Sequence, residues 1–194
     1  MAALIALKRS ALERPLAYAL RACAAVLITL MPLAYAQTAP QEYQVKAVFL
    51  FNFAQFVEWP AQAFAGPQAS FTMCVLGDDP FGAQLDEAIK GESVNGHPLT
   101  VQRYRSVSEL GPCQILFIGP SERGRLDGII EGLDDRAILT VSDIDGAAER
   151  GAIIQFANDR NRVRLRINVQ KARSAGLTLS SKLLRPAEIV EQRG

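Results

Sequence analysis

The sequence predicts an α/β domain with a mixed, mostly parallel sheet, flanked by helices and ending in an antiparallel hairpin. Two observations carry this prediction. Short apolar segments typical of buried strands alternate with short helical patterns through the first two thirds of the chain. A segment of strict apolar–polar alternation follows them. The first pattern is typical of parallel strands joined by crossover helices, and the second is typical of a half-buried hairpin.

Residues 1–36 have the features of a cleaved secretory signal peptide. Basic residues between Lys8 and Arg21 precede an apolar run from Ala22 to Leu33, and Ala34-Tyr35-Ala36 fits the small-x-small cleavage rule. The run is shorter than the roughly 20 apolar residues that span a bilayer. We therefore expect export to the periplasm and a single mature domain over residues 37–194. The formal net charge of the chain is +1, which argues against nucleic acid as a partner.

The first expected helix runs from Glu42 to Glu58, where Trp59-Pro60 ends it. Apolar residues occupy more than one side of this helix, which predicts burial on several sides. Two interpretations remain open. The helix packs entirely into the core, or its aromatic residues contact a second subunit or another protein. These residues are Phe49, Phe53, Phe56 and Trp59.

Strands and helices then alternate. A turn and short helix are expected within Asp78–Gly91, and a second helix from Ser121, as its N-cap, to about Gly132. After the hairpin, a short helix ends at Gly176, and an extended segment leads to a polar tail from Glu188. The expected strands are Ser70–Gly77, His97–Tyr104, Cys113–Gly119 and Arg136–Asp143, with the hairpin in Gly151–Gln170.

The second hairpin strand predicts one buried and one solvated side, because Val163, Leu165 and Ile167 alternate with polar residues. Arginine is favoured at interfaces for its rigid set of hydrogen-bond donors. We therefore expect the polar side to bind a partner, although a simple solvated surface explains the pattern equally well. The residues expected to bind the partner are Arg164, Arg166, Asn168 and Arg185.

The ends of the apolar strands bring polar residues to one edge of the predicted sheet, where open α/β sheets bind ligands. Ordinary turns and helix caps are the alternative, and they also explain the adjacent acids Asp78 and Asp79 better than a metal site does. His97 is the only histidine, and no phosphate-binding loop or nucleophile elbow is present. We expect no enzyme activity, cofactor or metal. The possible ligand rim consists of Asp78, Ser121, Ser142 and Asp143.

Two cysteines, Cys74 and Cys113, remain once the leader is removed. A pair of cysteines in an exported protein favours a disulfide. Cys74 falls inside one predicted strand and Cys113 at the start of another, so neighbouring strands could bring them within bonding range. A redox-responsive pair and two buried thiols remain alternatives.

Taken together, these segments resemble the YfiR-like (YfiR/HmsC) family of periplasmic regulators. The resemblance covers essentially the whole mature chain, in order, and it implies the α/β fold. Its motifs are Glu42-Tyr43-Gln44-Val45-Lys46-Ala47, Phe49 to Phe53, Val57 to Pro60, Cys74 to Gly77 with Asp79 to Gly82, Cys113 to Ile118, Leu139 to Asp143, Asn161 to Asn168, and Ser180 to Leu184.

The resemblance implies a non-enzymatic repressor that binds the periplasmic region of an inner-membrane diguanylate cyclase and limits cyclic di-GMP synthesis. An outer-membrane lipoprotein would release it. Members are typically homodimers, and Cys74 and Cys113 match a family pair that responds to redox conditions. A second family pair, expected within Asp143–Phe156, is absent. Two other functions remain possible: a small-molecule binding protein associated with a transporter or receptor, and a metal-dependent enzyme built on Asp78 and Asp79.

Overall fold

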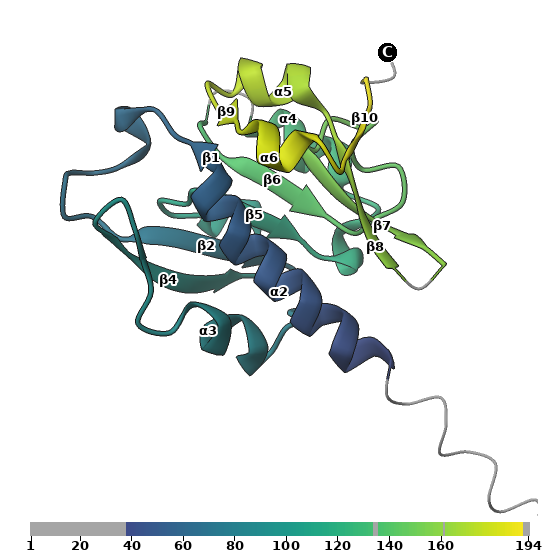
Figure 1. Ribbon diagram of the computed structural model, residues 1–194, viewed down its shortest axis with the longest axis horizontal. Coiled ribbons are helices and arrows are strands. Elements are labelled where there is room, and N and C mark those ends of the chain that lie inside the picture. Colours follow the sequence, from purple (N-terminus) through teal and green to yellow (C-terminus); the bar gives the residue numbers. More distant parts are fainter. Residues whose placement is uncertain (1–37, 134–135, 161, 192–194) are drawn as a thin grey trace, which may run out of the picture. The chain divides into compact units, whose positions relative to one another are not determined.

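The computed structural model describes residues 38–133, 136–160 and 162–191 (Figure 1). The predicted signal peptide lies outside these residues. The chain divides into two compact units at Ala39, and the unit that begins at Pro40 contains the sheet and its helices. Within the described part of the chain, no helix combines the length and apolarity needed to cross a membrane.

The main sheet of the described residues is mixed and mostly parallel, which confirms the predicted fold class. Its strand order is β10-β8-β7-β6-β5-β2-β4-β3. Parallel pairing joins β4, β2, β5, β6 and β7, and it also joins β8 to β10. The pairs β7–β8 and β3–β4 are antiparallel. The strands are β2 (Phe71–Leu76), β3 (Ser93–Val94), β4 (His97–Tyr104), β5 (Ile115–Ile118), β6 (Leu139–Ser142), β7 (Ile154–Asp159), β8 (Arg162–Ile167) and β10 (Glu188–Ile189).

Helices cover both faces of the sheet, and Figure 1 shows the longest of them, α2, crossing one face diagonally. A second, two-stranded sheet pairs β1 (Val57–Glu58) with β9 (Thr178–Leu179). The helices are α2 (Thr38–Phe56), α3 (Ala83–Ile89), α4 (Leu126–Glu131), α5 (Val169–Ser174) and α6 (Ser181–Leu184), with 3-10 turns η1 (Ala61–Ala63), η2 (Val107–Glu109) and η3 (Pro120–Glu122).

Alternate residues of the central strands build two separate cores. In β2, Met73 and Val75 point to the face that carries α2, α3, α5 and α6, whereas Cys74 and Leu76 point to the face that carries α4. Both sets are buried, because a parallel strand inside a sheet is covered on its two faces. This double coverage explains why β2 and β5 have nearly continuous apolar sequences.

The ends of several predicted helices differ from the structure. The first helix ends at Phe56 rather than Glu58, because Val57 and Glu58 pair with β9. Ser121 was expected to cap a helix that begins there, and this expectation is wrong. Ser121 lies in η3, and α4 begins only at Leu126, after an Arg125 N-cap that makes no side-chain hydrogen bond.

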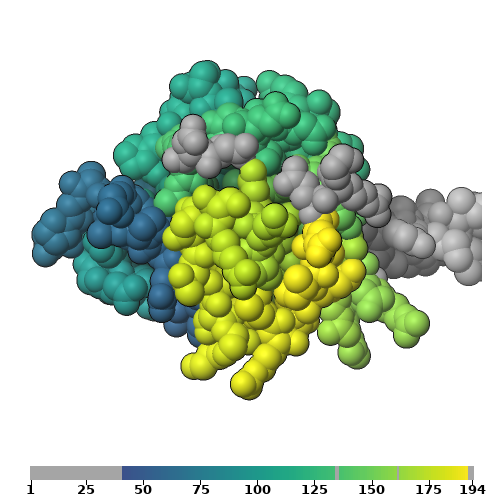
Figure 2. All heavy atoms as spheres, turned by 90° about the horizontal axis from the view of Figure 1, so that it is seen from above, coloured from purple at the N-terminus to yellow at the C-terminus, as the bar shows by residue number. Residues whose placement is uncertain are grey.

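The C-terminal segment contains more regular structure than the predicted extended segment and polar tail. Ser180 caps α6, since its side chain accepts a hydrogen bond from the Lys182 amide. Glu188 and Ile189 then pair with Arg166 and Ile167 as the edge strand β10. In the space-filling view from above, the yellow segment from α5 to β10 covers much of the visible surface (Figure 2).

Candidate functional site

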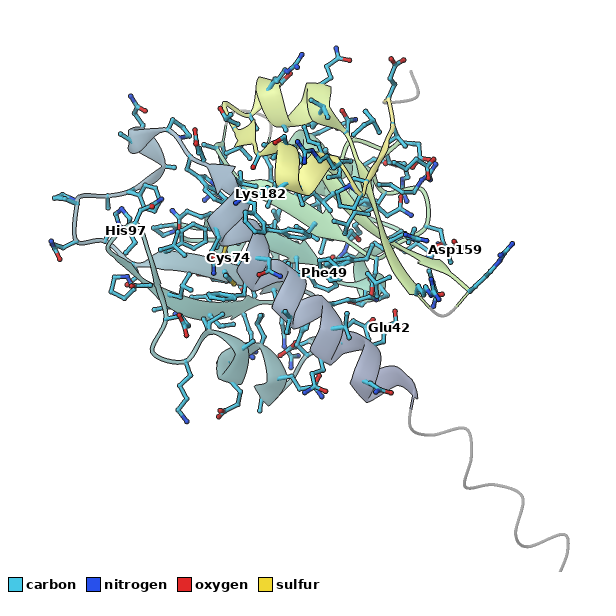
Figure 3. All side chains as sticks on the ribbon, in the orientation of Figure 1. Glu42, Phe49, Cys74, His97, Asp159 and Lys182 are labelled. Carbon is cyan, nitrogen blue, oxygen red and sulfur yellow. A yellow bond between two sulfur atoms is a disulfide. The ribbon has the colours of Figure 1, made fainter. Side chains whose placement is uncertain are left out.

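A row of arginines lies on the solvated side of β8. Arg162 and Arg164 are exposed, whereas Leu165 and Ile167 are buried on the opposite side of the strand. Residues two apart on a strand point the same way, about 6.6 to 6.8 Å from each other. Arg162, Arg164 and Arg166 therefore form a row, which we call the arginine row, beside β7 (Figure 3 labels Asp159 at the end of that strand).

The members of the arginine row differ in how strongly the protein itself holds them. Arg166 contacts Glu149, whose side chain is 10% exposed, and pairs with Glu188 at 2.9 Å. The hydrogen bond with Glu188 raises the pKa of Arg166 and lowers the pKa of Glu188. Arg164 lies 3.8 Å from the carboxylate of Asp159, and both side chains are more than half exposed. Arg164 is thus more available to a partner than Arg166.

Two other residues were expected to accompany these arginines. Arg185 is exposed at the end of α6. Asn168 does not continue the solvated side of β8, which corrects that expectation, because it is 1% exposed. Its side chain accepts a hydrogen bond from the Lys171 amide and donates one to the Ala148 carbonyl at 3.2 Å. β8 ends at Ile167, so Asn168 serves as the N-cap of α5.

The four aromatic residues proposed for docking have different environments. Phe53 is fully buried and stacks on Phe156 at 5.8 Å between ring centroids, so it belongs to the core rather than to a surface. Trp59 is partly buried, donates a hydrogen bond to the Gln114 carbonyl, and packs edge-on against Phe71.

The other two aromatic residues, Phe49 and Phe56, are partly buried at the sides of α2. Phe49, which Figure 3 labels on α2, lies 5.9 Å from Phe156 between ring centroids. The Lys182 ammonium lies 5.9 Å from the centre of the Phe56 ring. These two residues retain some exposed surface, and they flank the outermost side of the helix.

The two serines of the predicted ligand rim form hydrogen bonds within the protein. Ser121 accepts a hydrogen bond from the Asp78 amide at 2.9 Å. A Cβ atom on Gly77, which has φ of +90°, would lie 2.3 Å from Ser121 Oγ, so this close approach requires glycine. Ser142 is fully buried and donates to the Ile118 carbonyl. The structure thus brings Asp78 and Ser121 together, and the Ser121 hydroxyl bonds to the Asp78 backbone amide, whereas the Asp78 side chain is exposed.

Asp143, the fourth rim residue, belongs to a buried charge cluster that the sequence analysis did not identify. Its carboxylate accepts hydrogen bonds from Lys46 at 2.7 Å and Tyr43 at 2.8 Å, and the Lys46 and Asp143 side chains are only 5% and 6% exposed. Glu42 adds a second pair to Lys46 at 2.6 Å. Burial and the Asp143 carboxylate raise the pKa of Tyr43. The cluster therefore holds α2 against Asp143, the residue that follows β6.

Cys74 and Cys113 form a disulfide, with Cα atoms 6.1 Å apart. The two residues are 1% and 5% exposed and belong to the core beneath α4. Cys74 lies in β2, and Cys113 lies just before the neighbouring strand β5. The bond therefore links two central segments of the fold.

A cavity of about 450 Å³ lies away from the predicted rim, between α4, β6 and α5. Arg136 and Lys171 lie at its wall, with Ile130, Ile138 and Thr140. Arg136 also donates a hydrogen bond to the Gly111 carbonyl. No group of three or more potential metal-binding side chains was found among the described residues.

Comparisons with known proteins give one finding. The family described as YfiR/HmsC-like matches residues 43–188, which include all of the sheet strands described above except Ile189 of β10. A comparison with curated proteins gives no match. The match covers most of the chain and agrees with the motifs from Glu42 to Leu184. The chain therefore belongs to the YfiR/HmsC-like family, whose members act as regulators of diguanylate cyclase signalling rather than as enzymes.

Proposed function

We propose that this protein is a periplasmic repressor of an inner-membrane diguanylate cyclase. It binds the periplasmic sensor region of the cyclase and holds cyclic di-GMP synthesis down, and an outer-membrane lipoprotein releases it. The observation that carries the proposal is the family match over residues 43–188. The signal-like sequence of residues 1–36 supports export to the periplasm.

The arginine row suggests the chemistry of the cyclase contact. Its guanidinium groups can each form paired hydrogen bonds with carboxylates, and the Arg164 side chain is 54% exposed. An acidic surface or an acidic extended segment complements this row. Charge complementarity of this kind raises association rates and rejects partners with the same charge.

Envelope crosslinking tests the proposal directly. The tagged mature chain is expressed in its own organism, crosslinked in intact envelopes, captured, and its partners are identified by mass spectrometry. We expect an inner-membrane protein with a cytoplasmic cyclase domain, together with an outer-membrane lipoprotein. Recovery of transporter components instead, with cellular cyclic di-GMP unchanged by deletion of the gene, would contradict the proposal.

A charge reversal tests the contact surface. Arg164→Glu should reduce recovery of the cyclase about tenfold or more and raise cellular cyclic di-GMP, because it places like charge against an acidic partner. Arg105→Glu is the matched control, since Arg105 is also exposed but follows β4, near the other end of the strand order. Equal recovery of the cyclase by the two variants would show that the arginine row is not part of the contact.

The small-molecule alternative receives less support from the structure. Several of its rim groups bond within the protein: Ser121 Oγ accepts from the Asp78 amide, Ser142 donates to the Ile118 carbonyl, and one Asp143 oxygen accepts from Lys46. A binding protein would be stabilised by its ligand, which a screen of melting temperature against small molecules would detect.

A further inference from the structure

A cavity of about 410 Å³ lies beyond the end of α2, between β1, the η1 turn and the start of β4. Its volume falls within the range of small-molecule sites in proteins. No residue of β8 lines it, so it is separate from the arginine row. We call it the aromatic cavity, because four of its lining residues carry aromatic rings: Trp59, Phe64, Phe71 and His97, of which Figure 3 labels His97.

The Trp59 side of the aromatic cavity is held in place by Gln114, which is 2% exposed. The Trp59 indole donates a hydrogen bond to the Gln114 carbonyl at 3.1 Å and packs edge-on against Phe71. The Gln114 side chain donates to the Ala63 carbonyl at 2.6 Å and accepts from the Thr72 amide at 2.7 Å. Gln114 therefore joins the indole, the η1 turn and β2 into one wall.

The His97 side of the aromatic cavity is also held by contacts within the protein. Nδ1 of His97 lies 2.6 Å from the Ala69 carbonyl oxygen, which can only accept, so Nδ1 carries the proton. The imidazole stacks on the Phe64 ring, with 4.1 Å between ring centroids and 12° between planes. Rings that are already fixed avoid much of the ordering cost that binding otherwise imposes.

The charge of the aromatic cavity comes from one carboxylate. Glu58 lines the cavity and is exposed, and no lysine or arginine lines it. Within the described part of the chain, no basic side chain forms an ion pair with Glu58. An unpaired carboxylate attracts cations and repels anions. Aromatic ring faces also attract cations, through their negative charge density. The carboxylate and the rings thus favour the same class of ligand.

We propose that the aromatic cavity binds a free small organic cation that carries a methylated ammonium group. The Trp59 and His97 Nδ1 protons are used within the protein, and much of the remaining wall is aromatic carbon. A primary ammonium has three N–H donors, and it would lose hydrogen bonds to water that this wall does not replace. A quaternary ammonium has no such donors to lose. The proposal does not rest on the cyclase contact, so failure of one leaves the other standing.

The first test compares choline with 3,3-dimethylbutan-1-ol, which has the same shape but a carbon atom in place of the charged nitrogen. Trp59 is the only tryptophan of the chain, so its fluorescence reports binding to the purified mature protein. We expect the dissociation constant of choline to be about fivefold lower than that of the alcohol, or lower still, because only choline gains from the rings and the carboxylate. Equal affinity for the two compounds would overturn the proposal, as would no binding of choline at every concentration tested.

The second test removes one aromatic ring but keeps the apolar volume. Phe64→Leu should weaken choline binding about threefold or more and leave the affinity for the alcohol nearly unchanged. Phe56→Leu is the matched control, because Phe56 is also partly buried but does not line the aromatic cavity. The melting temperature of each variant establishes that it is folded. Equal effects of Phe64→Leu on choline and on the alcohol would overturn the role of the rings.

The third test removes the carboxylate. Glu58→Gln should weaken choline binding about twofold to fivefold, as expected for an exposed charge pair. Glu131→Gln, at the exposed end of α4, is the control and should leave binding unchanged. Equal affinity of the two variants for choline would overturn the role assigned to Glu58.

The last test asks whether the cation is free or part of a lipid. We expect no cosedimentation of the mature chain with phosphatidylcholine vesicles, because the phosphate of the headgroup would bring negative charge close to Glu58. Cosedimentation that free choline abolishes would overturn the assignment to a free cation.

Discussion

Lys46 shows how much the attachment of α2 depends on a single side chain. Removal of one partner from a buried ion pair leaves the other charge without compensation and costs about 3–5 kcal/mol. We expect Lys46→Met to lower the free energy of unfolding by about that amount, because the Asp143 carboxylate, which is 6% exposed, then has no cationic partner. Urea denaturation monitored by Trp59 fluorescence measures the loss.

Two further variants separate burial from charge. The pair of Lys90 and Glu87 is exposed, with side chains 74% and 68% exposed. We therefore expect Lys90→Met to change the free energy of unfolding by about 1 kcal/mol or less. Lys46→Met together with Asp143→Leu should recover most of the loss, since neither charge then remains buried. A loss in Lys46→Met no larger than that in Lys90→Met would show that solvent compensates the charge of Asp143.

Single residues were the hardest features to infer from the sequence. Asn168 fits the alternation of β8 but lies one position past the last strand residue, where capping of α5 decides its side-chain position. Lys46 interrupts an otherwise apolar side of its helix, and that interruption was the available signal for a buried ion pair. Its partner Asp143 is 97 residues away, beyond the reach of any local pattern.

At the scale of elements, the edge strand β10 should open more readily when its ion pair is removed. The Glu188 carboxylate pairs with Arg166, and the Val190 amide donates to the Ile167 carbonyl at 3.0 Å. Pairing lowers the pKa of Glu188 below its ordinary value of about 4.3. The pair therefore contributes stability above pH of about 4.3, and this contribution disappears as the pH falls through the lowered pKa.

Hydrogen exchange at the Val190 amide measures this opening. Glu188→Gln should lower the protection factor of that amide at neutral pH, and the wild-type value should approach that of the variant at acid pH. Glu191→Gln is the control, because Glu191 is exposed just beyond the strand. Equal protection in wild type and Glu188→Gln at neutral pH would mean that backbone pairing alone holds β10.

Local sequence patterns predicted the elements in which apolar, buried positions recur regularly along the chain. β2, β4, β5, β6 and the β7–β8 hairpin follow directly from apolar runs and alternation. The strands β1, β9 and β10 have two residues each and exist only through pairing with distant segments. Their sequences carry too few residues to show a period, so only the tertiary structure reveals them.

At the scale of the whole molecule, the proposed partner surface and the buried charge cluster lie on different elements of one folded unit. The arginine row lies on β8, and the charge cluster attaches α2 at Asp143. Both elements contribute to the same core, through Leu165 of β8 and Leu50 of α2.

The disulfide should stabilise the whole unit, because it links the central strand β2 to the segment entering β5. Cys74 and Cys113 are 39 residues apart, and a loop of that length corresponds to about 4 kcal/mol in the chain-entropy model. We expect the Cys74→Ala, Cys113→Ala variant to lose about 2–4 kcal/mol of unfolding free energy. Urea denaturation with and without reductant measures this difference.

Reductant should affect the two proteins differently. It should lower the stability of the wild type toward that of the double variant and leave the variant itself unchanged. Reduction of the folded wild type should also be slow, since the cysteines are 1% and 5% exposed and thiolates must reach a sulfur atom to exchange. Rapid reduction under native conditions would show that the core beneath α4 opens easily, and the cysteine pair would then be suited to respond to the redox state of its surroundings.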